Sequence, residues 1–171
     1  IDHGTITAIV DDQAFEITTL RKDVQTDGRR AVIAFADNWE DDAMRRDFTM
    51  NTLLMNEKGG VFDPTNQGLE DLESRTVRFV GDAETRICED VLRILRFFRF
   101  HATYGENDPE DKALSACVKH ADKIRELSKE RITQEFLKIL SLDNPVDILR
   151  IMFDNKVLKE FDYGVENLET L

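Results

Sequence analysis

The sequence predicts an α+β protein in which short strands come first and helices follow. The first 35 residues contain short β-branched runs separated by polar turns, a pattern typical of strands. Beyond Gly81 the apolar residues recur at helical spacing, and the turn signals are those of helix ends. These two observations divide the chain near residue 81, into a small α+β unit over residues 1–80 and a helical unit over residues 81–171.

Three strands are expected in the first 35 residues of the first unit. Residues 5–10 and 14–20 are β-branched runs on either side of a polar turn, and the second run alternates apolar and polar side chains. Residues 31–35 form an apolar run of similar length. The charged stretch between the second and third strands contains Asp27-Gly28 and is expected to be a mobile loop.

A helix is expected from Glu40 to the glycine pair at 59–60, because acidic residues open the segment and apolar residues recur at helical spacing. One stripe of this helix would carry Met44, Phe48, Asn51 and Met55. Two short strands, at residues 61–62 and 77–80, are expected to flank a turn at residues 63–68.

The helical unit opens with an amphipathic segment over residues 86–102. One arc of this segment, the expected core face, carries Ile87, Val91, Ile94, Leu95, Phe98 and Ala102. The opposite arc carries Arg86, Glu89, Asp90, Arg93 and Arg96. Further helices are expected at Asp108-Pro109 and Asn144-Pro145, where a capping residue precedes a proline suited to the first turn.

The composition excludes several classes of protein. With 41% apolar residues, eight glycines and three prolines, the chain is neither a disordered tail nor a low-complexity linker. No run approaches the roughly 18 apolar residues that span a bilayer, so no membrane partner is expected. Cys88 and Cys117 make no disulfide framework, and without a secretory signal they indicate a cytoplasmic protein. The net charge of −12 argues against bulk attraction of nucleic acid and leaves room for a local basic groove.

The polar arc of residues 86–102 contains a pair with possible recognition chemistry. Helical spacing sets Asp90 and Arg93 about one turn apart, which puts a carboxylate acceptor beside a guanidinium donor. Cytosine and adenine show an amine next to an unprotonated ring nitrogen, whereas guanine and uracil show a carbonyl next to a ring N–H. The pair therefore fits C and A better than G and U. The alternative is a solvated face whose ion pairs only support the helix.

A second candidate site is the run Arg45-Arg46-Asp47. Two adjacent arginines cannot share one helix face, so they are expected to serve different partners. One guanidinium could clamp a triphosphate as a planar fork, while Asp47 accepts a hydrogen bond from a ribose hydroxyl. The alternative is surface pairing with the acidic residues at 40–42.

These segments together resemble the class II tRNA nucleotidyltransferases, known as CCA-adding enzymes, and the bacterial poly(A) polymerases related to them. Four segments are similar to that family's motifs B, C, D and E, in this order: Arg45-Arg46-Asp47-Phe48-Thr49, Asp63-Pro64 with Gly68 and Asp71-Leu72, Glu89-Asp90-x-x-Arg93-x-x-Arg96, and Arg131-Ile132-x-x-Glu135-Phe136. His3-Gly4-Thr5 and the segment from Phe15 to Arg21 also lie where the family has its HGT segment and the strand before its flexible loop. The resemblance runs from His3 to about Leu158.

The resemblance implies both a fold and a reaction. Residues 1–80 would be part of a nucleotidyltransferase head of the polymerase-β type, and residues 81–171 the helical neck and the start of the body, which bind nucleotide and RNA. The family transfers CMP and AMP from CTP and ATP to an RNA 3′ end, without a nucleic-acid template. Carboxylates hold two Mg²⁺ ions for this transfer.

The resemblance also implies roles for individual residues. The base template would comprise Glu89, Asp90, Arg93 and Arg96, and the ribose and phosphates would be held by Arg21, Arg45, Arg46 and Asp47. Asp63 and Gly68 would belong to the turn that couples head and neck. Glu16 would be the third carboxylate of the catalytic metal site, and its alternative is an exposed glutamate of a strand.

One departure from the family pattern concerns the metal site. The family's glycine-containing turn and its Asp-x-Asp pair precede the HGT segment, whereas this chain starts at Ile1-Asp2-His3. A fragment that is inactive by itself is therefore expected. Within the family, CCA-adding, CC-adding and A-adding enzymes and a poly(A) polymerase remain open, with tRNA or another RNA as partner. Outside it, the alternative is a non-catalytic nucleotide- or RNA-binding module that kept motifs B and D.

Overall fold

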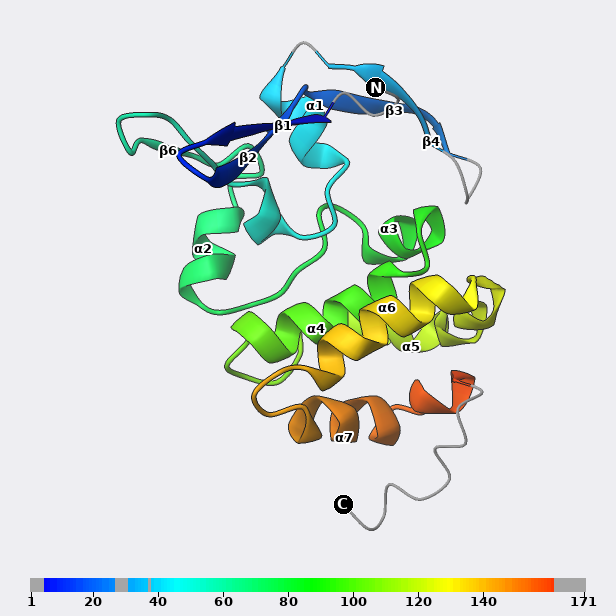
Figure 1. Cartoon of the computed structure of the whole chain (residues 1–171). Helices are drawn as coiled ribbons and strands as arrows, with labels where there is room; N and C mark the ends of the chain where they lie inside the picture. Colours follow the sequence, from blue (N-terminus) through cyan, green and yellow to red (C-terminus); the bar gives the residue numbers. More distant parts are fainter. Residues whose placement is uncertain (1–4, 27–30, 37, 162–171) are drawn as a thin grey trace.

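The computed structural model describes residues 5–26, 31–36 and 38–161 of the chain. Strands and short helices of the first half form one end of the molecule, and the helices of the second half are stacked at the other end (Figure 1). This arrangement confirms the α+β class. Among the described residues, no helix is both long enough and apolar enough to cross a membrane.

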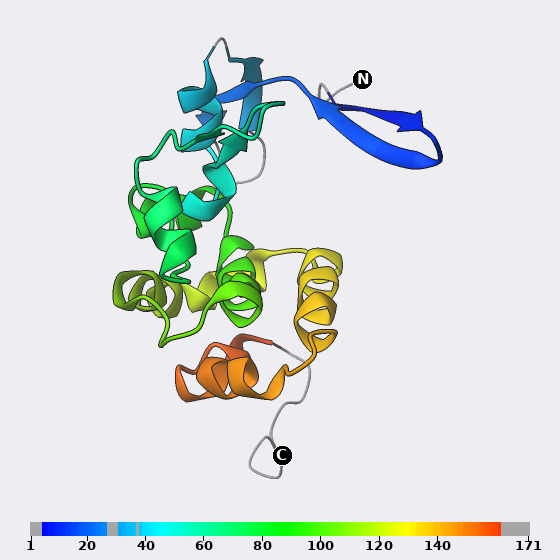
Figure 2. The same cartoon turned by 90° about the vertical axis from the view of Figure 1, so that its left-hand side faces the viewer.

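The first two strands form a hairpin. Strands β1 (Thr5–Val10) and β2 (Gln13–Thr18) pair antiparallel, as predicted, and the hairpin extends away from the rest of the molecule (Figure 2). Its two turn residues, Asp11 and Asp12, have φ values of 49° and 62°. Positive φ at both positions is the type I′ geometry that matches the right-handed twist of a two-residue hairpin, and aspartate tolerates it better than most residues.

A second pair of strands corrects the predicted loop. Strand β3 (Arg21–Thr26) pairs antiparallel with β4 (Ala31–Phe35), with a register shift between Asp23 and Gln25. The predicted strand at 31–35 is confirmed, but the mobile loop is wrong for residues 21–26, and residues 27–30 lie outside the described residues. The backbone hydrogen bonds of the polar strand β3 are formed with the apolar strand β4. The polar composition of residues 21–26 does not by itself reveal that such a partner exists.

The predicted helix from Glu40 to the glycine pair is wrong beyond its first turns. Helix α1 (Trp39–Met44) begins where Asn38 accepts a hydrogen bond from the backbone N–H of Asp41 (2.7 Å). The chain then becomes extended at Phe48 and continues through the 3₁₀ turn η1 (Thr49–Thr52) into the strand pair β5 (Leu54–Met55) and β6 (Val61–Phe62).

The side chain of Phe48 explains why the helix ends. Phe48 is completely buried and forms a β-bridge with Phe79, with ring centroids 5.0 Å apart. This bridge is all that the described chain retains of the predicted strand at 77–80. The burial gained by a phenylalanine in the core outweighs the weak helical preference of residues 45–55. Met44 and Met55, expected on the same stripe as Phe48, are exposed.

The turn after β6 leads into helix α2 (Gly68–Glu73), which packs on η1. Gly68 permits this approach, because a Cβ atom at this position would lie 2.7 Å from the carbonyl oxygen of Thr49. Such a distance is well below normal contact, so any side chain here would push α2 away from η1.

The second half is helical as predicted. It consists of α3 (Ala83–Glu89), α4 (Arg93–Tyr104), α5 (Asp111–Lys119), the 3₁₀ turn η2 (Ala121–Glu126), α6 (Lys129–Leu140), α7 (Val146–Asp154) and the short η3 (Leu158–Glu160). Helix α7 begins directly after Pro145, close to its predicted start. Helix α5 begins at Asp111 with Glu110 as its cap, so the start predicted at Asp108-Pro109 is wrong.

The continuous helix predicted over residues 86–102 is interrupted. At Asp90 the backbone is extended, with φ −151° and ψ 104°, and α4 begins three residues later. The carboxylate of Asp90 accepts a hydrogen bond from the backbone N–H of Leu92 (3.2 Å), which stabilises the start of the new helix. The break therefore turns Asp90 out of the helical register that its spacing from Arg93 suggested.

Helix α4 lies at the centre of the core. Its buried side chains pack against α6 and α7 and also against the first half of the chain, where the ring centroids of Phe79 and Phe97 are 5.7 Å apart. Phe48, Phe79 and Phe97 thus form an aromatic bridge between the two halves. The hydrophobic core is continuous across the boundary proposed near residue 81.

Candidate functional site

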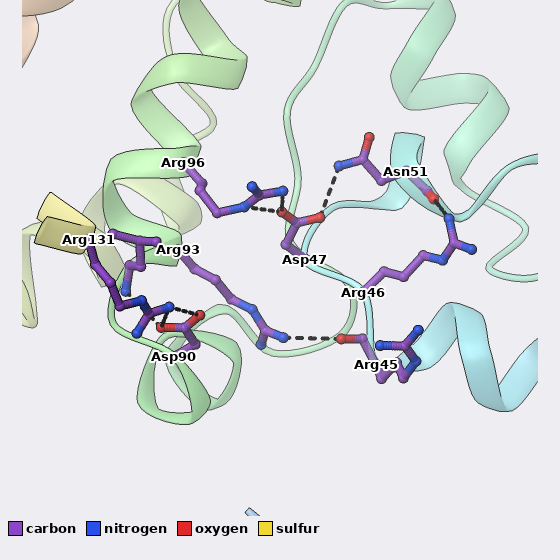
Figure 3. A pocket seen from close by; sticks show the side chains of 9 residues that line it. Arg45, Arg46, Asp47, Asn51, Asp90, Arg93, Arg96 and Arg131 are labelled. Carbon is purple, nitrogen blue, oxygen red and sulfur yellow. Dashed lines mark hydrogen bonds and ion pairs between the residues drawn. The ribbon is translucent and has the colours of Figure 1, made fainter. Parts of the chain in front are cut away.

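A cavity of about 580 Å³ lies where the segment after α1 faces the break between α3 and α4 (Figure 3). Its lining residues are Arg45, Arg46, Asp47, Asn51, Asp90, Leu92, Arg93, Arg96 and Arg131. The first three belong to the motif that resembles motif B, and Asp90, Arg93 and Arg96 belong to the motif that resembles motif D. The fold thus brings together six of the predicted site residues from two distant segments.

The lining of the cavity is strongly basic for an acidic protein. Within the described part of the chain it includes five arginines and two aspartates, although the whole chain carries a net charge of −12. Guanidinium groups converging on a concave surface create a local positive potential and offer planar donor pairs that match phosphate or carboxylate oxygens. The cavity is therefore suited to an anionic ligand.

Two of these arginines are oriented by one buried carboxylate. Asp42 accepts from Nη2 of Arg45 (2.8 Å) and Nη2 of Arg46 (2.9 Å), and also from the backbone N–H of Arg21 (3.1 Å). Burial raises the pKa of Asp42, but the hydrogen bonds from Arg46, Arg45 and Arg21 outweigh it and hold the pKa below its ordinary value.

The expectation that adjacent arginines serve different partners is therefore wrong for their ion pairs. Arg45 is the residue at which α1 ends, so the backbone turns there and both guanidinium groups reach back to Asp42, one on each oxygen. Arg46 makes an additional hydrogen bond from Nη1 to the carbonyl of Asn51 (2.6 Å).

Asp47 is a buried link between the first half and α4. One carboxylate oxygen accepts from Nε of Arg96 (2.7 Å), and the other accepts from the side-chain amide of Asn51 and the backbone N–H of Phe48 (both 2.9 Å). The side chain lines the cavity, yet both of its oxygens already have protein partners. The ribose contact that the resemblance implies for Asp47 would have to share this carboxylate.

Asp90 and Arg93 both line the cavity, but each pairs with a different residue. The two oxygens of Asp90 accept from Nη2 of Arg131 at 3.0 and 2.9 Å. Arg93 donates from Nη1 to Glu89 (2.7 Å) and from Nη2 to the carbonyl of Arg45 (3.1 Å). Figure 3 shows Asp90 directed to Arg131 and Arg93 directed to the backbone carbonyl of Arg45.

Glu89 lies behind the cavity and does not line it. Its carboxylate pairs with Arg86 and Arg93, and Arg86 in turn donates to the carbonyl of Met44 (2.8 Å). Glu89 therefore fixes the orientation of Arg93 and helps to join α3 to the end of α1.

Asp63 and Gly68 lie outside the cavity, in the turn before α2. The carboxylate of Asp63 accepts from the backbone N–H of Leu69 (3.0 Å) and from the backbone and hydroxyl of Thr65 (3.1 and 2.8 Å). Burial raises the pKa of Asp63, but these hydrogen bonds, with a further one involving Gly68, outweigh it and lower the pKa. The turn is thus well ordered by its own hydrogen bonds.

The described residues reveal a polar connection between the two halves of the chain that the sequence reasoning missed. Buried Asp71 accepts from the hydroxyl of Thr49 (2.7 Å) and from Nε of Arg78 (3.1 Å). Arg78 also donates to Glu110 (3.1 Å), the cap of α5. This chain of contacts runs from η1 through α2 to the helical half.

Glu16 and Arg21 lie away from the cavity lining. Glu16 is exposed on β2, opposite Thr7 of β1. Arg21 donates from Nη2 to the hydroxyl of Thr5 (2.6 Å), and its backbone N–H supports Asp42. Arg21 therefore influences Arg45 and Arg46 through Asp42.

The described residues do not fit a magnesium site by themselves. No group of three or more His, Cys, Asp or Glu side chains among them is arranged to hold a metal ion. Glu16, the candidate metal ligand, is an exposed strand residue of the projecting hairpin. A two-metal site needs several carboxylates close together.

Asn51 and Arg131 line the cavity although they were not predicted as site residues. Asn51 was expected on the stripe of a helix, and only the extended chain at Phe48 turns it toward Asp47. Arg131 belongs to the segment resembling motif E, but it lies 41 residues from Asp90 in the sequence. The spacing of residues along the sequence does not predict a contact between residues so far apart.

Comparison with known proteins identifies the family. Residues 1–78 match a family model described as "Poly A polymerase head domain", and residues 108–162 match one described as "Probable RNA and SrmB- binding site of polymerase A". The human protein "CCA tRNA nucleotidyltransferase 1, mitochondrial" is 42% identical over 98% of this chain and 41% of its own length. The "CCA-adding enzyme" of Streptococcus gordonii is 44% identical over 82% of this chain and 35% of its own length.

A solved structure has the same fold. The Bacillus stearothermophilus CCA-adding enzyme, solved in complex with CTP, aligns with a TM-score of 0.85 and 31% identity over 96% of this chain and 40% of its own length. The chain thus spans about two fifths of the length of the human relative and of this solved structure, and about one third of the length of the Streptococcus gordonii enzyme. Together, the two family models, the relatives and the solved structure show that the chain belongs to the family of class II CCA-adding enzymes and poly(A) polymerases.

Proposed function

We propose that the protein is a template-independent RNA 3′-terminal nucleotidyltransferase that adds CMP and AMP from CTP and ATP to the 3′ end of tRNA. Its arginine-lined cavity would bind the incoming nucleoside triphosphate. The observation that carries this proposal is the meeting of two predicted motifs, Arg45-Arg46-Asp47 and Asp90 with Arg93, around one basic cavity. The names of the relatives, and the complex of the Bacillus stearothermophilus enzyme with CTP, support the same substrate class.

In this proposal the phosphates are bound by arginines that are already oriented. Asp42 engages Nε and Nη2 of Arg45, which leaves donors of a five-donor guanidinium to face a ligand. A prearranged guanidinium loses less side-chain entropy when a triphosphate binds than a free one does.

The base is read by Asp90 and Arg93. The carboxylate of Asp90 would accept from the exocyclic amine of cytosine or adenine, and Arg93 would donate to the neighbouring ring nitrogen. Guanine and uracil would present a carbonyl to the carboxylate, which is unfavourable. Arg93 suits this role because Glu89 and the carbonyls of Arg45 and Arg86 fix its side chain. Glu89 and Arg96 would act as braces, through Arg93 and Asp47.

The chain would supply two adjoining parts of the enzyme. Residues 1–80 would serve as part of the head, and residues 81–171 as the neck and the start of the body, with Asp63 and Gly68 in the coupling turn. Mg²⁺ is proposed as the cofactor of the enzyme as a whole. The cytoplasm remains the proposed compartment, beside the mitochondrial location in the name of the human relative.

The test uses the product of the complete gene with CTP and ATP. A tRNA that lacks its terminal CCA should gain C, C and A, whereas an unrelated RNA should not be extended. Repeated addition of A to both RNAs would identify a poly(A) polymerase instead. Binding of CTP without any incorporation would favour the non-catalytic binding module. Lys58→Ala, which removes one positive charge from the exposed turn between β5 and β6 outside the cavity, serves as the control variant.

A further inference from the structure

Arg131 reaches the cavity from α6, across the break between α3 and α4. One of its nitrogens, Nη2, lies between the two oxygens of Asp90, at 3.0 and 2.9 Å (Figure 3). The backbone N–H of Leu92 takes a further position on one of these oxygens. The acceptor that the proposed function assigns to the base therefore already has protein partners.

Among the described residues that line the cavity, Arg131 is held less firmly than the other arginines. The carboxylates that bind Arg45, Arg46 and Arg96 have side chains no more than 9% exposed. Arg93 is 13% exposed and has two carbonyl partners besides Glu89. The side chains of Arg131 and Asp90 are 46% and 34% exposed.

This difference in exposure decides which ion pair exchanges most readily. Water and salt screen an exposed pair and compete for its donors, so such a pair contributes little and opens easily. A pair on a buried carboxylate is much harder to open, because the charge left behind would be desolvated. The Asp90–Arg131 pair is thus the ion pair of the cavity that a ligand can displace.

We propose that Arg131 competes with the incoming base for the carboxylate of Asp90, and so lowers the selectivity of the cavity for C and A. The proposal rests on the proposed function of Asp90 as the base acceptor. The exocyclic amine of C or A must displace Arg131 from Asp90. The carbonyl of U or G can instead accept from Arg131 itself, which masks the repulsion by the carboxylate. Arg131 is thus a specificity-determining residue that reduces the preference of the cavity for C and A over U and G.

The test measures the dissociation constants of CTP and UTP by calorimetry on the full chain and on Arg131→Ala. Both nucleotides carry the same triphosphate, so the ratio of the two constants cancels any phosphate contact of Arg131. The ratio Kd(UTP)/Kd(CTP) should rise about two- to five-fold in Arg131→Ala, the scale of one exposed ion pair. Arg131→Lys should lie between the two, and Lys58→Ala should match the unchanged chain.

Salt gives a second readout of the same competition. Raising the ionic strength weakens the exposed pair, so the ratio should increase with salt in the unchanged chain and stay level in Arg131→Ala.

The outcomes separate this inference from the proposed function. A fall in the ratio in Arg131→Ala would mean that Arg131 positions Asp90 for the base, and would overturn the competition. An unchanged ratio with CTP still bound would overturn it as well. Absence of CTP binding by the unchanged chain would instead overturn the proposed cavity, and the inference with it.

Discussion

At the scale of single residues, the cavity is built from carboxylates that orient arginines. Asp42, Asp47 and Glu89 each bind at least one guanidinium. Asp90 differs, because its partner Arg131 is half exposed. A carboxylate with a weak partner is the one able to take a new hydrogen bond from a ligand.

The first prediction concerns Asp90. In the product of the complete gene, Asp90→Ala should remove the acceptor for the amine of C or A and leave Arg93 to donate to the carbonyl of U or G. Each lost or mismatched hydrogen bond costs about 1–3 kcal/mol, so selectivity for CTP and ATP over UTP and GTP should fall roughly ten- to a hundred-fold. Relative kcat/KM for the four triphosphates measures the change.

A melting curve of the same variant provides the control. If Asp90 only braced the junction between α3 and α4, the melting temperature would fall and all four substrates would slow alike. That result would contradict the role of Asp90 as base reader.

At the scale of secondary-structure elements, the packing of α2 on η1 depends on the absence of a side chain at Gly68. Gly68→Ala should destabilise the protein by about 1–3 kcal/mol, because the new Cβ atom would lie 2.7 Å from the carbonyl oxygen of Thr49. Denaturant unfolding measures this loss. Glu73→Ala is the control, since it changes an exposed side chain of the same helix α2 and adds no atom at the contact with η1. Equal stability of the two variants would rule out the tight contact.

The contact between α4 and α6 should respond to pH. Glu135 on α6 is 3% exposed and accepts from Arg99 of α4 and from Lys138. Burial raises the pKa of Glu135, but the hydrogen bonds from Arg99 and Lys138 outweigh it and hold the pKa below its ordinary value near 4.5. A depressed carboxyl pKa contributes stability that is complete above the ordinary value and is lost as the pH falls through the folded value.

Glu135→Gln should therefore be less stable than the unchanged chain at pH 7 and lose less stability between pH 5 and pH 3. Denaturant unfolding at several pH values measures both effects. Parallel curves for the two proteins would show that Glu135 does not contribute to the acid sensitivity.

The elements that the sequence predicted are those whose signal is local. The β-branched runs of β1, β2 and β4 and the helices beyond Gly81 follow from spacing alone. Two of the misses depend on partners outside the segment itself: β3 needs β4, and the extended chain at Phe48 needs Phe79. The break at Asp90 is local, but no glycine or proline marks it in the amphipathic pattern of residues 86–102. The site follows the same division. Adjacent residues such as Arg45 and Arg46 were predicted, whereas Arg131 required knowledge of how α6 packs.

At the scale of the whole molecule, we expect the chain to bind CTP without transferring CMP to RNA. The 171-residue chain should bind CTP through its cavity, yet add no CMP to a tRNA lacking CCA in the presence of Mg²⁺, because Glu16 is its one candidate ligand for the metal among the described residues. Calorimetry and gel analysis of the labelled RNA test the two parts. Measurable incorporation by the purified chain would contradict the prediction.

The aromatic bridge of Phe48, Phe79 and Phe97 limits how this protein can be recombined. A head built from residues 1–80 places two of its buried rings against a ring of α4, so it borrows part of its core from the helices. In a chimera that replaces residues 1–80 with those of a relative, the buried side chains of the new head would pack poorly against Phe97 of α4. We expect a stable chimera only when the buried face of α4 is exchanged together with residues 1–80. The segment that can be replaced as one piece is therefore longer than the head domain inferred from the motifs.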